Sequence, residues 1–398
     1  MELSQCKERL DAWFSDKEPE MLSMLERIVN MDSFTNDAAD VNKVGEVVTG
    51  WLAEAGFHTT KLPKKPAPAD EQWMNGLGNV FSARTHSVEC GPGVAFIGHM
   101  DTVFPAGTAD RATGPGVTDM KAGIVQNMFV ARALKELGLM DVPMTLTFSP
   151  DGELGSPSTT PILGEQLNGA QAVICTEPGY PGGGVTLERK GSGHMFLEIM
   201  GISAHAGRCY QDGASAILEL AHKILAFDAY VDLDHDTTVN TGLVNGGTSA
   251  NSVAPNASAR IHITFKTLEA GRRLAEALRA ETAKNHIPGT SSHISGGVRL
   301  PPLVPTPGVM KLFSLAEQAG ELIGYSVHSA PSKGTAESGY CSSVLGVPAI
   351  CSMGPEGSNL HSADEYMIPS TFVPRGKLAA LTAIQAARAF APAAKVSL

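Results

Sequence analysis

The sequence predicts an α/β protein, with a mixed central sheet flanked by helices and a second, smaller domain inserted into the first. Two observations support this prediction. Short apolar runs bounded by turn residues, which indicate buried strands, alternate with stretches of helical periodicity. From about residue 191 the expected order changes to β-α-β-β-α-β, a known compact unit of ferredoxin-like type. The predicted domains are 1–190 with 298–398, and the insertion 191–297.

Composition narrows the class of protein. The chain has 398 residues, enough for about two or three domains, and 43% of them are hydrophobic. Lys and Arg number 30 against 41 Asp and Glu, a net charge of −11 that argues against nucleic acid or an anionic membrane as partner. No apolar run approaches a membrane span, and the N-terminus does not resemble a signal peptide. Six scattered cysteines suggest reduced thiols, so we expect a cytoplasmic protein. With nucleic acid and membrane disfavoured, we expect a small-molecule substrate.

The first domain is expected to begin with helices, because apolar residues recur at helical spacing up to Leu52. Its further predicted elements are a proline-containing loop at 61–76, a strand at 94–97, an active-site loop at 104–116, a helix at 117–137, and strands at 144–149 and 172–175. In the inserted domain we expect strands at 193–202, 241–244, 257–265 and 291–298, with helices at 214–226 and 270–283. The first domain then resumes with helices at 308–324, 335–345 and 374–390 and a strand at 347–351.

Five residues suited to a divalent metal recur at the ends of these strands or in loops. They are His99, Asp119, Glu153, Glu177 and His361. Imidazole and carboxylate ligands fit zinc, manganese or cobalt, and a carboxylate shared by two ions would hold them about 3.5–4 Å apart. Each residue alone is more simply a helix cap, a surface acid or a core histidine. Together they predict a site for one or two ions, with zinc the first choice.

His99 has a carboxylate two residues away, in Asp101. Residues two apart on an extended chain share a face, so Asp101 could orient an imidazole that binds a metal. Smaller features receive simpler interpretations. The Arg189-Lys190 pair beside the domain junction is expected to be a solvent-exposed patch, and Cys175 a core residue.

Six ordered motifs resemble the di-zinc metallopeptidase family that includes aminoacylase, acetylornithine deacetylase, peptidase T and glutamate carboxypeptidase. The motifs are Gly98-His99-Met100-Asp101-Thr102-Val103, residues 116–123, Asp151-Gly152-Glu153-Leu154-Gly155-Ser156, Thr176-Glu177-Pro178-Gly179, Ser203-Ala204-His205-Ala206-Gly207 and residues 361–366. The resemblance spans nearly the whole chain. It implies that the insertion is a lid or dimerisation domain, and that the protein forms a homodimer or a higher homo-oligomer.

The resemblance also implies roles for the candidate residues. Asp119 would bridge two metals, His99 and Glu177 would complete one site, and Glu153 and His361 the other. Asp101 would orient His99. His205, in the inserted domain, would reach the substrate or the transition-state oxyanion.

The acidic motif departs from the family pattern. The family has Asp-Glu-Glu, with the first Glu as general base, where this chain has Asp151-Gly152-Glu153. A general base is typically worth about 10²–10⁴ in rate, so ordinary peptidase chemistry should be crippled. The glycine could ease a tight turn, reflect natural divergence, or be an engineered inactivation. Asp151, Glu337 or Glu356 could supply a substitute base.

The substrate-reading positions depart as well. Gly246-Gly247-Thr248 leads to Asn251 as in the family's lid motif, but the expected arginine is replaced by Thr264, or by Lys266. A Gly-Gly-Thr-Ser-Asp-Gly-Asn type segment becomes residues 333–339. These changes predict a retained metal site and a changed substrate, with Asn251, Gly152 and Thr264 as the substrate-binding candidates.

Three functions remain open. The first is hydrolysis of an amide C–N bond in an N-acyl amino acid or a dipeptide-like substrate, by a metal-activated water. The second is release of ammonia from a non-peptide amine, such as the aromatic ring of a nitroanthranilate, which could accept hydroxide without the usual base. The third is a catalytically inactive homologue that binds metal and a metabolite.

Overall fold

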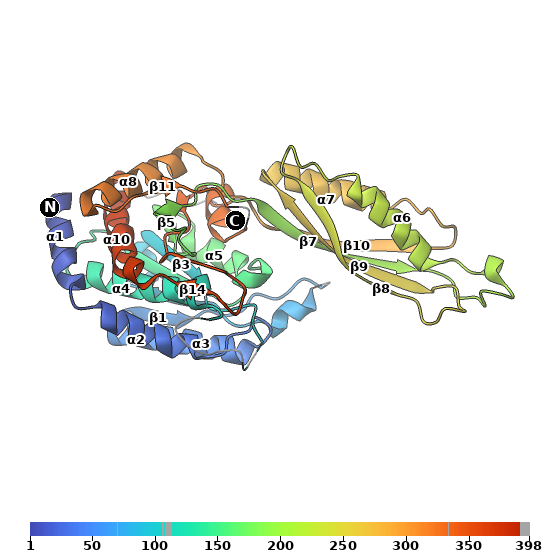
Figure 1. Cartoon of the computed structure of the whole chain (residues 1–398), viewed down its shortest axis with the longest axis horizontal. Coiled ribbons are helices and arrows are strands. Elements are labelled where there is room, and N and C mark those ends of the chain that lie inside the picture. Colours follow the sequence, from blue (N-terminus) through green and yellow to red (C-terminus); the bar gives the residue numbers. More distant parts are fainter. Residues whose placement is uncertain (70, 106, 108–113, 333, 391–398) are drawn as a thin grey trace. The chain divides into compact units, whose positions relative to one another are not determined.

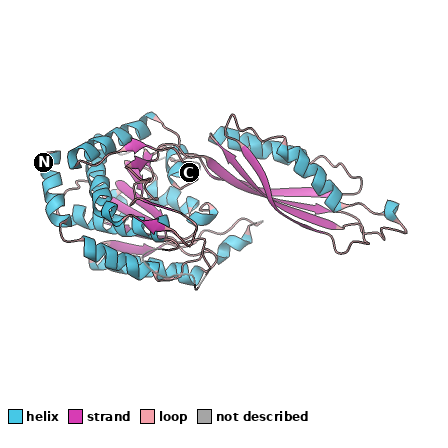
Figure 2. Cartoon of the chain, in the orientation of Figure 1, coloured by secondary structure: helices cyan, strands magenta, loops and turns pink. Residues whose placement is uncertain are grey.

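The computed structural model describes residues 1–69, 71–105, 107, 114–332 and 334–390. They form two compact units, Met1–Arg189 with Leu303–Leu398 (unit 1) and Lys190–Pro302 (unit 2). The return to unit 1 lies beyond the predicted boundary at 298, because the strand that precedes it continues to Leu300. Both units combine helices with a sheet (Figure 2). Within the described part of the chain, every helix is too short or too polar to cross a membrane.

A mixed six-stranded sheet forms the centre of unit 1 (Figure 1), which confirms the predicted fold class. Its order is β1-β2-β4-β3-β5-β12. The β4, β3, β5 and β12 strands are parallel, and β1 and β2 join antiparallel at one edge. The bounds are His58–Lys61 (β1), Phe81–Arg84 (β2), Met144–Ser149 (β4), Val94–His99 (β3), Ala172–Cys175 (β5) and Ala349–Ile350 (β12).

Helices flank this sheet, and most were expected from their periodicity. Val41, Val44, Val48 and Leu52 bury one face of α3, which begins where Asp37 accepts hydrogen bonds from the Ala39 and Asp40 amides. The helices of unit 1 are Leu3–Phe14 (α1), Glu18–Val29 (α2), Ala38–Glu54 (α3), Gly123–Glu136 (α4), Thr160–Leu167 (α5), Pro307–Ile323 (α8), Ser338–Ser343 (α9) and Phe372–Ala389 (α10). Short 3-10 turns cover Gln72–Gly76, Val88–Cys90, Gly152–Leu154 and Pro369–Thr371.

The predicted active-site loop at 104–116 falls partly outside the described residues, because Ala106 and residues 108–113 are not among them. The predicted helix at 117–137 begins with a π turn, Val117–Ala122, before α4. Within this turn Asp119 and Met120 have non-helical backbone angles, and the bond between them is cis. Asp119 therefore sits on an irregular segment that leads into α4.

Two small pairs of strands complete unit 1. Gly184–Val185 (β6) pairs in parallel with His328–Ser329 (β11). Gly357–Ser358 (β13) pairs antiparallel with Tyr366–Met367 (β14), so the residues between them form the loop of a hairpin that contains His361.

Unit 2 has the predicted β-α-β-β-α-β order. Its elements are Gly191–Met200 (β7), Ala216–Asp228 (α6), Thr238–Gly246 (β8), Asn256–Phe265 (β9), Leu268–Thr282 (α7) and Ser291–Leu300 (β10), with a 3-10 turn at Tyr210–Asp212. The sheet is antiparallel in the order β10-β7-β9-β8. Alternate residues of β9, such as Ile261 and Ile263, enter the hydrophobic core, which also takes in residues of α6 and α7. The β8 strand is an edge of the sheet, and most of its residues are exposed.

Candidate metal centre

Three adjacent parallel strands of unit 1 end at the same place. His99 is the last residue of β3, Glu153 follows β4 in a short 3-10 turn, and Glu177 follows β5 by two residues. The β3 strand lies between β4 and β5, so their carboxyl ends bring these side chains together. All of β3 is buried because its Val-Ala-Phe-Ile run faces core on both sides.

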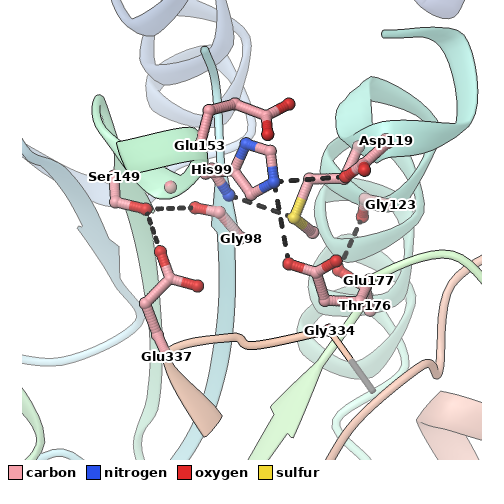
Figure 3. A network of polar contacts seen from close by, with 12 residues as sticks. Gly98, His99, Asp119, Gly123, Ser149, Glu153, Thr176, Glu177, Gly334 and Glu337 are labelled. Atoms are coloured by element: carbon pink, nitrogen blue, oxygen red, sulfur yellow. Dashed lines mark hydrogen bonds and ion pairs between the residues drawn. The ribbon is translucent and has the colours of Figure 1, made fainter. Parts of the chain in front are cut away.

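Five side chains form two ligand groups that share Asp119. His99, Asp119 and Glu177 make one group, and Asp119, Glu153 and His361 make the other, with ligand atoms of each group within 4.8 Å of one another. His99 Nε2 lies 3.2 Å from Asp119 Oδ1 and 3.6 Å from Glu177 Oε1 (Figure 3). His361 Nε2 lies 3.3 Å from Asp119 Oδ2 and 3.0 Å from Glu153 Oε2. Asp119 thus offers one carboxylate oxygen to each group.

The electrostatics of the cluster are those of a site built for positive charge. Burial raises the pKa of Glu177 well above its usual range, and the nearby Asp119 carboxylate adds to this. Burial lowers the pKa of His99, but Asp101 and Asp119 outweigh it and raise that pKa well above the usual value. Asp119 and Glu153 raise the pKa of His361 to about 10. Clustered carboxylates repel each other unless cations lie between them.

The donor set fits divalent metal ions. Asp119 Oδ1 is buried and has no hydrogen-bond partner among the described residues, although His99 Nε2 is close to it. A buried carboxylate oxygen without a donor is unfavourable in a protein interior unless a cation binds it. Imidazole nitrogens with carboxylate oxygens are typical ligands of zinc, manganese and cobalt.

Asp101 connects His99 to the loop that carries Glu153. His99 Nδ1 lies 3.1 Å from the backbone oxygen of Asp101 and 3.3 Å from its Oδ1. Both are acceptors, so they favour a proton on Nδ1, and Nε2 is the ring nitrogen that faces Asp119 and Glu177. Asp101 also accepts hydrogen bonds from the Gly152 amide at 2.9 Å and from the Thr35 hydroxyl at 2.7 Å. Thr35 has a supporting role that no motif in the sequence indicated.

Gly152 packs against the His99 ring. A Cβ atom at position 152 would lie 2.3 Å from Cγ of His99 and 2.5 Å from its Cβ. Gly152 is not among the glycines with a positive φ, whereas Gly155, three residues later, has φ 80°. The interpretation that Gly152 eases a tight turn is therefore wrong, because the need for glycine comes from the close approach of His99.

Each of the three suggested substitute bases already has structural partners. Asp151 accepts hydrogen bonds from the Ser158 amide and from the Ser158 and Thr159 hydroxyls, and burial raises its pKa to about 6. Glu337 accepts from the Ser149 and Ser156 hydroxyls, both at 2.7 Å, and Figure 3 shows it turned toward Ser149. Glu356 accepts from the Gly182 and Gly183 amides at 2.9 Å.

Three predicted site residues belong to unit 2. His205 is exposed, and its Nδ1 accepts a hydrogen bond from the Gly207 amide at 3.1 Å. Asn251 lies close to the segment of His205, because the Asn251 carbonyl oxygen accepts a hydrogen bond from the Ala206 amide at 3.0 Å. Thr264 lies elsewhere, on β9, where its hydroxyl shares a hydrogen bond with the Thr238 hydroxyl. His205 and Asn251 thus form one local pair, and Thr264 is not part of it.

Sequence reasoning missed two buried charged residues near the ligand groups. Arg189 was expected in a solvent-exposed patch, which is wrong: it is buried and donates to Cys351 Sγ, Ser332 Oγ and Ser352 Oγ. Glu365 lies in the last of the six motifs but was assigned no role. Its carboxylate accepts hydrogen bonds from the backbone amides of Gly116, Thr118 and Asp119. The groups that bind Arg189 and Glu365 are distant in the chain, so no periodic pattern in the sequence indicates that these two residues are buried.

Unit 1 is a mixed α/β unit that holds two imidazole–carboxylate groups around one aspartate, and a β-α-β-β-α-β unit is inserted into its sequence. This combination is that of a metallopeptidase-like hydrolase. Residues 95–385 match the model of Peptidase family M20/M25/M40. The chain belongs to this family.

Among its relatives, carboxypeptidase G2 of Pseudomonas sp. (strain RS-16) is 23% identical over 376 residues, covering 91% of this chain and 88% of the relative. Among solved structures, the Bacillus subtilis YXEP protein, described as a dinuclear metal binding peptidase, has a TM-score of 0.65 at 14% identity over 94% of this chain and all of the other. A putative aminohydrolase from methicillin-resistant Staphylococcus aureus has a TM-score of 0.73 at 13% identity, covering 95% and 99%. These structures share the fold.

Proposed function

We propose that this protein is a metal-dependent hydrolase that cleaves an amide C–N bond in a small, carboxylate-bearing substrate, an N-acyl amino acid or a dipeptide-like amide. The observation that carries the proposal is the pair of ligand groups around Asp119. Membership of the M20 family supports hydrolysis at peptide-type bonds. The similarity to a carboxypeptidase supports a substrate that carries a free carboxylate.

In this proposal His99, Asp119 and Glu177 hold one ion, and Asp119, Glu153 and His361 hold the other, with zinc favoured over manganese and cobalt. Such ions would polarise the scissile carbonyl and supply hydroxide near neutral pH. Asp101 keeps the proton on His99 Nδ1 and thereby directs Nε2 toward the ligand group. We propose that His205 and Asn251 contact the substrate. Thr264 would stand in for the family's arginine and would contact the substrate more weakly than an arginine does.

In this chain a different group would have to act as the general base. Gly152 has no side chain to take up a proton, and the His99 ring fills the space beside it. For a substitute the proposal names Glu337, which is buried and is joined to the strand of His99 because Ser149 Oγ also lies 3.4 Å from the Gly98 carbonyl oxygen. If Glu337 serves as base, Glu337→Gln should lower turnover by about 10²–10⁴.

The close packing of Gly152 against His99 favours a second candidate, an aminohydrolase that releases ammonia from an electron-poor aromatic amine. Such a ring accepts hydroxide more readily than an amide does, so the reaction depends less on a carboxylate base. The third candidate, an inactive homologue that binds metal and a metabolite, predicts tight binding without turnover.

For unit 2 we propose a role as lid and dimerisation domain. The exposed edge strand β8 supports this, because Leu243 and Val244 on it are 62% and 60% exposed. An edge strand that exposes apolar side chains is a surface that a second copy can cover.

One experiment separates these functions. The protein is saturated with zinc, its metal content is measured, and N-acyl amino acids, dipeptides and aromatic amines are screened with separate detection of free amino acids and of ammonia. Release of amino acid supports the amidohydrolase, ammonia from an aromatic amine supports the aminohydrolase, and two bound ions without turnover support the binding protein. Protein that binds no zinc would overturn the proposal.

A further inference from the structure

We propose that Glu365 is a positioning residue that locks the turn carrying Asp119 to the hairpin carrying His361, and so sets the affinity for both metal ions. The inference rests on the proposed function, because it assumes that these two side chains bind metal. The Glu365 carboxylate binds backbone amides of the Asp119 turn, and no ligand side chain is among these partners. Its contacts are with the backbone that holds the ligands in place.

The Glu365 carboxylate is fully buried and binds three backbone amides of one turn. Oε1 accepts hydrogen bonds from the Thr118 amide at 2.8 Å and the Asp119 amide at 2.9 Å, and Oε2 accepts from the Gly116 amide at 3.1 Å. Thr118 and Asp119 are themselves buried, so their amides depend on an acceptor that the protein supplies. A charged acceptor makes each such bond stronger than a neutral one would.

These amides need an acceptor from outside the turn. The turn Val117–Ala122 precedes α4, and the first amides of a helical segment have no carbonyl oxygen behind them to bind. Asp119 also departs from helical angles, which removes the regular ladder at that point. Glu365 therefore supplies, from 246 residues away in sequence, the acceptor that this irregular segment lacks.

The other end of the connection is the hairpin loop that carries His361. Glu365 directly precedes β14, and its own amide donates to the Ser362 carbonyl oxygen at 3.2 Å. Asn359 Nδ2 donates to the Asp364 carbonyl oxygen at 3.2 Å, and Ser362 Oγ donates to the Asn359 carbonyl oxygen at 2.7 Å. The loop from Asn359 to Glu365 is thus tied to itself, so anchoring Glu365 anchors His361.

A second contact joins the same two segments. A Cβ at Gly357, on β13, would lie 2.6 Å from the Thr118 hydroxyl and methyl, so the hairpin packs directly on the Asp119 turn. Together these contacts hold His361 Nε2 at 3.3 Å from Asp119 Oδ2, although the residues are far apart in the chain. Because Asp119 serves both ligand groups, a shift of its turn should weaken both sites.

The variant that tests this is Glu365→Gln. It keeps the size of the side chain but replaces one carboxylate oxygen with an NH2 group that faces backbone donors. The matched control is Glu219→Gln, since Glu219 is also a buried carboxylate that binds two backbone amides, those of His286 and Ile287, in unit 2, which carries no proposed metal ligand. Both variants should lower the melting temperature of metal-free protein.

The measurement is zinc affinity of the metal-free full-length protein, by competition with a chromophoric chelator, together with the visible spectrum of the cobalt-substituted protein. We expect Glu365→Gln to weaken binding at both sites by about 10–100-fold and to change the cobalt spectrum, and Glu219→Gln to change neither. Zinc affinity equal to that of wild type in Glu365→Gln, or an equal loss in both variants, would overturn the inference.

Glu365→Asp provides a second variant if the glutamine protein does not fold. Its carboxylate is one methylene shorter, so it should also bind zinc more weakly than wild type, and unchanged affinity would count against the inference. Failure of the proposed function gives a different result, because wild-type protein itself would then bind fewer than two zinc ions.

Discussion

The His99 imidazole lies against the Gly152 backbone so closely that a Cβ atom on Gly152 would be 2.3 Å from His99 Cγ. The neighbouring Asp101 holds both residues, through its contact with His99 Nδ1 and its hydrogen bond from the Gly152 amide. A side chain at position 152, where the family has its general base, would therefore require the His99 ring or the 3-10 turn of residue 152 to shift in this chain.

Reintroducing a side chain at 152 should therefore damage the metal site. We expect Gly152→Ala to lower the free energy of unfolding by about 1–3 kcal/mol, because the His99 ring or the loop must move. Gly152→Glu should in addition weaken zinc binding and show no gain in amide hydrolysis. Metal titration and chemical denaturation measure both effects.

The control for these variants is Gly50→Ala, in α3, where a Cβ would meet nothing within 4 Å. It should leave zinc binding unchanged and slightly stabilise the helix. If Gly152→Glu instead acquired amidase activity with full zinc content, the link between Gly152 and His99 would be refuted and a lapsed peptidase would be the better description.

The shared position of Asp119 leads to a prediction about metal stoichiometry. Asp119→Ala removes an oxygen from each ligand group, so we expect it to lose both zinc ions. His361→Ala removes a ligand from one group only, so about one zinc ion per chain should remain after dialysis. Elemental analysis of the dialysed proteins distinguishes the two, and equal losses in both variants would contradict two separate groups.

The ligand groups could be predicted from the sequence because parallel strands place their carboxyl ends together. His99, Glu153 and Glu177 each follow a predicted short strand, and the sheet brings the ends of these three strands together. Asp119 and His361 lie on irregular segments, and only the motifs around them indicated that they are candidate ligands.

Other features depend on contacts that no local pattern records. The β1 strand, His58–Lys61, is four mostly exposed residues at the edge of the sheet, so it has no apolar alternation and the sequence predicted no strand there. Arg189 looks like a surface residue until its partners Ser332, Cys351 and Ser352, more than 140 residues away, surround it. The steric reason for Gly152 likewise required His99 in three dimensions.

The exposed edge of unit 2 gives a prediction about assembly. Leu243 on β8 is 62% exposed, and a second copy paired along this strand would bury it. Leu243→Asp should therefore shift the protein from dimer to monomer in sedimentation velocity, because a charge directly in an apolar interface is unfavourable. Val88→Asp, at a residue 68% exposed in unit 1, is the matched control and should leave the dimer intact. Wild-type protein that sediments as a monomer at high concentration would contradict the proposed dimer.

Cys351 is a buried thiol beside a buried cation. Arg189 Nε donates to its Sγ at 3.2 Å. Burial raises the pKa of the Cys351 thiol, but the hydrogen bond with Cys175 and the charge of Arg189 outweigh it and lower that pKa to about 6. The other titratable groups whose charge couples to this thiol are Glu177 and Cys341, and burial raises the pKa of Cys341 so that it stays neutral.

A thiol whose pKa falls from about 8.5 in the unfolded chain to about 6 in the folded one makes stability depend on pH. Between these values the unfolded state binds more protons, so the free energy of unfolding should rise with pH by up to about 1.4 kcal/mol per unit, and this contribution is lost as pH falls through 6. Cys351→Ala should remove that slope, whereas Cys341→Ala should retain it, and urea unfolding of the zinc-saturated proteins at pH 6, 7 and 8 measures the difference. Thiolate absorbance in the ultraviolet that appears near pH 6 in wild type and not in Cys351→Ala gives an independent check. Identical slopes of unfolding free energy against pH in wild type and Cys351→Ala would show that Arg189 does not hold a thiolate.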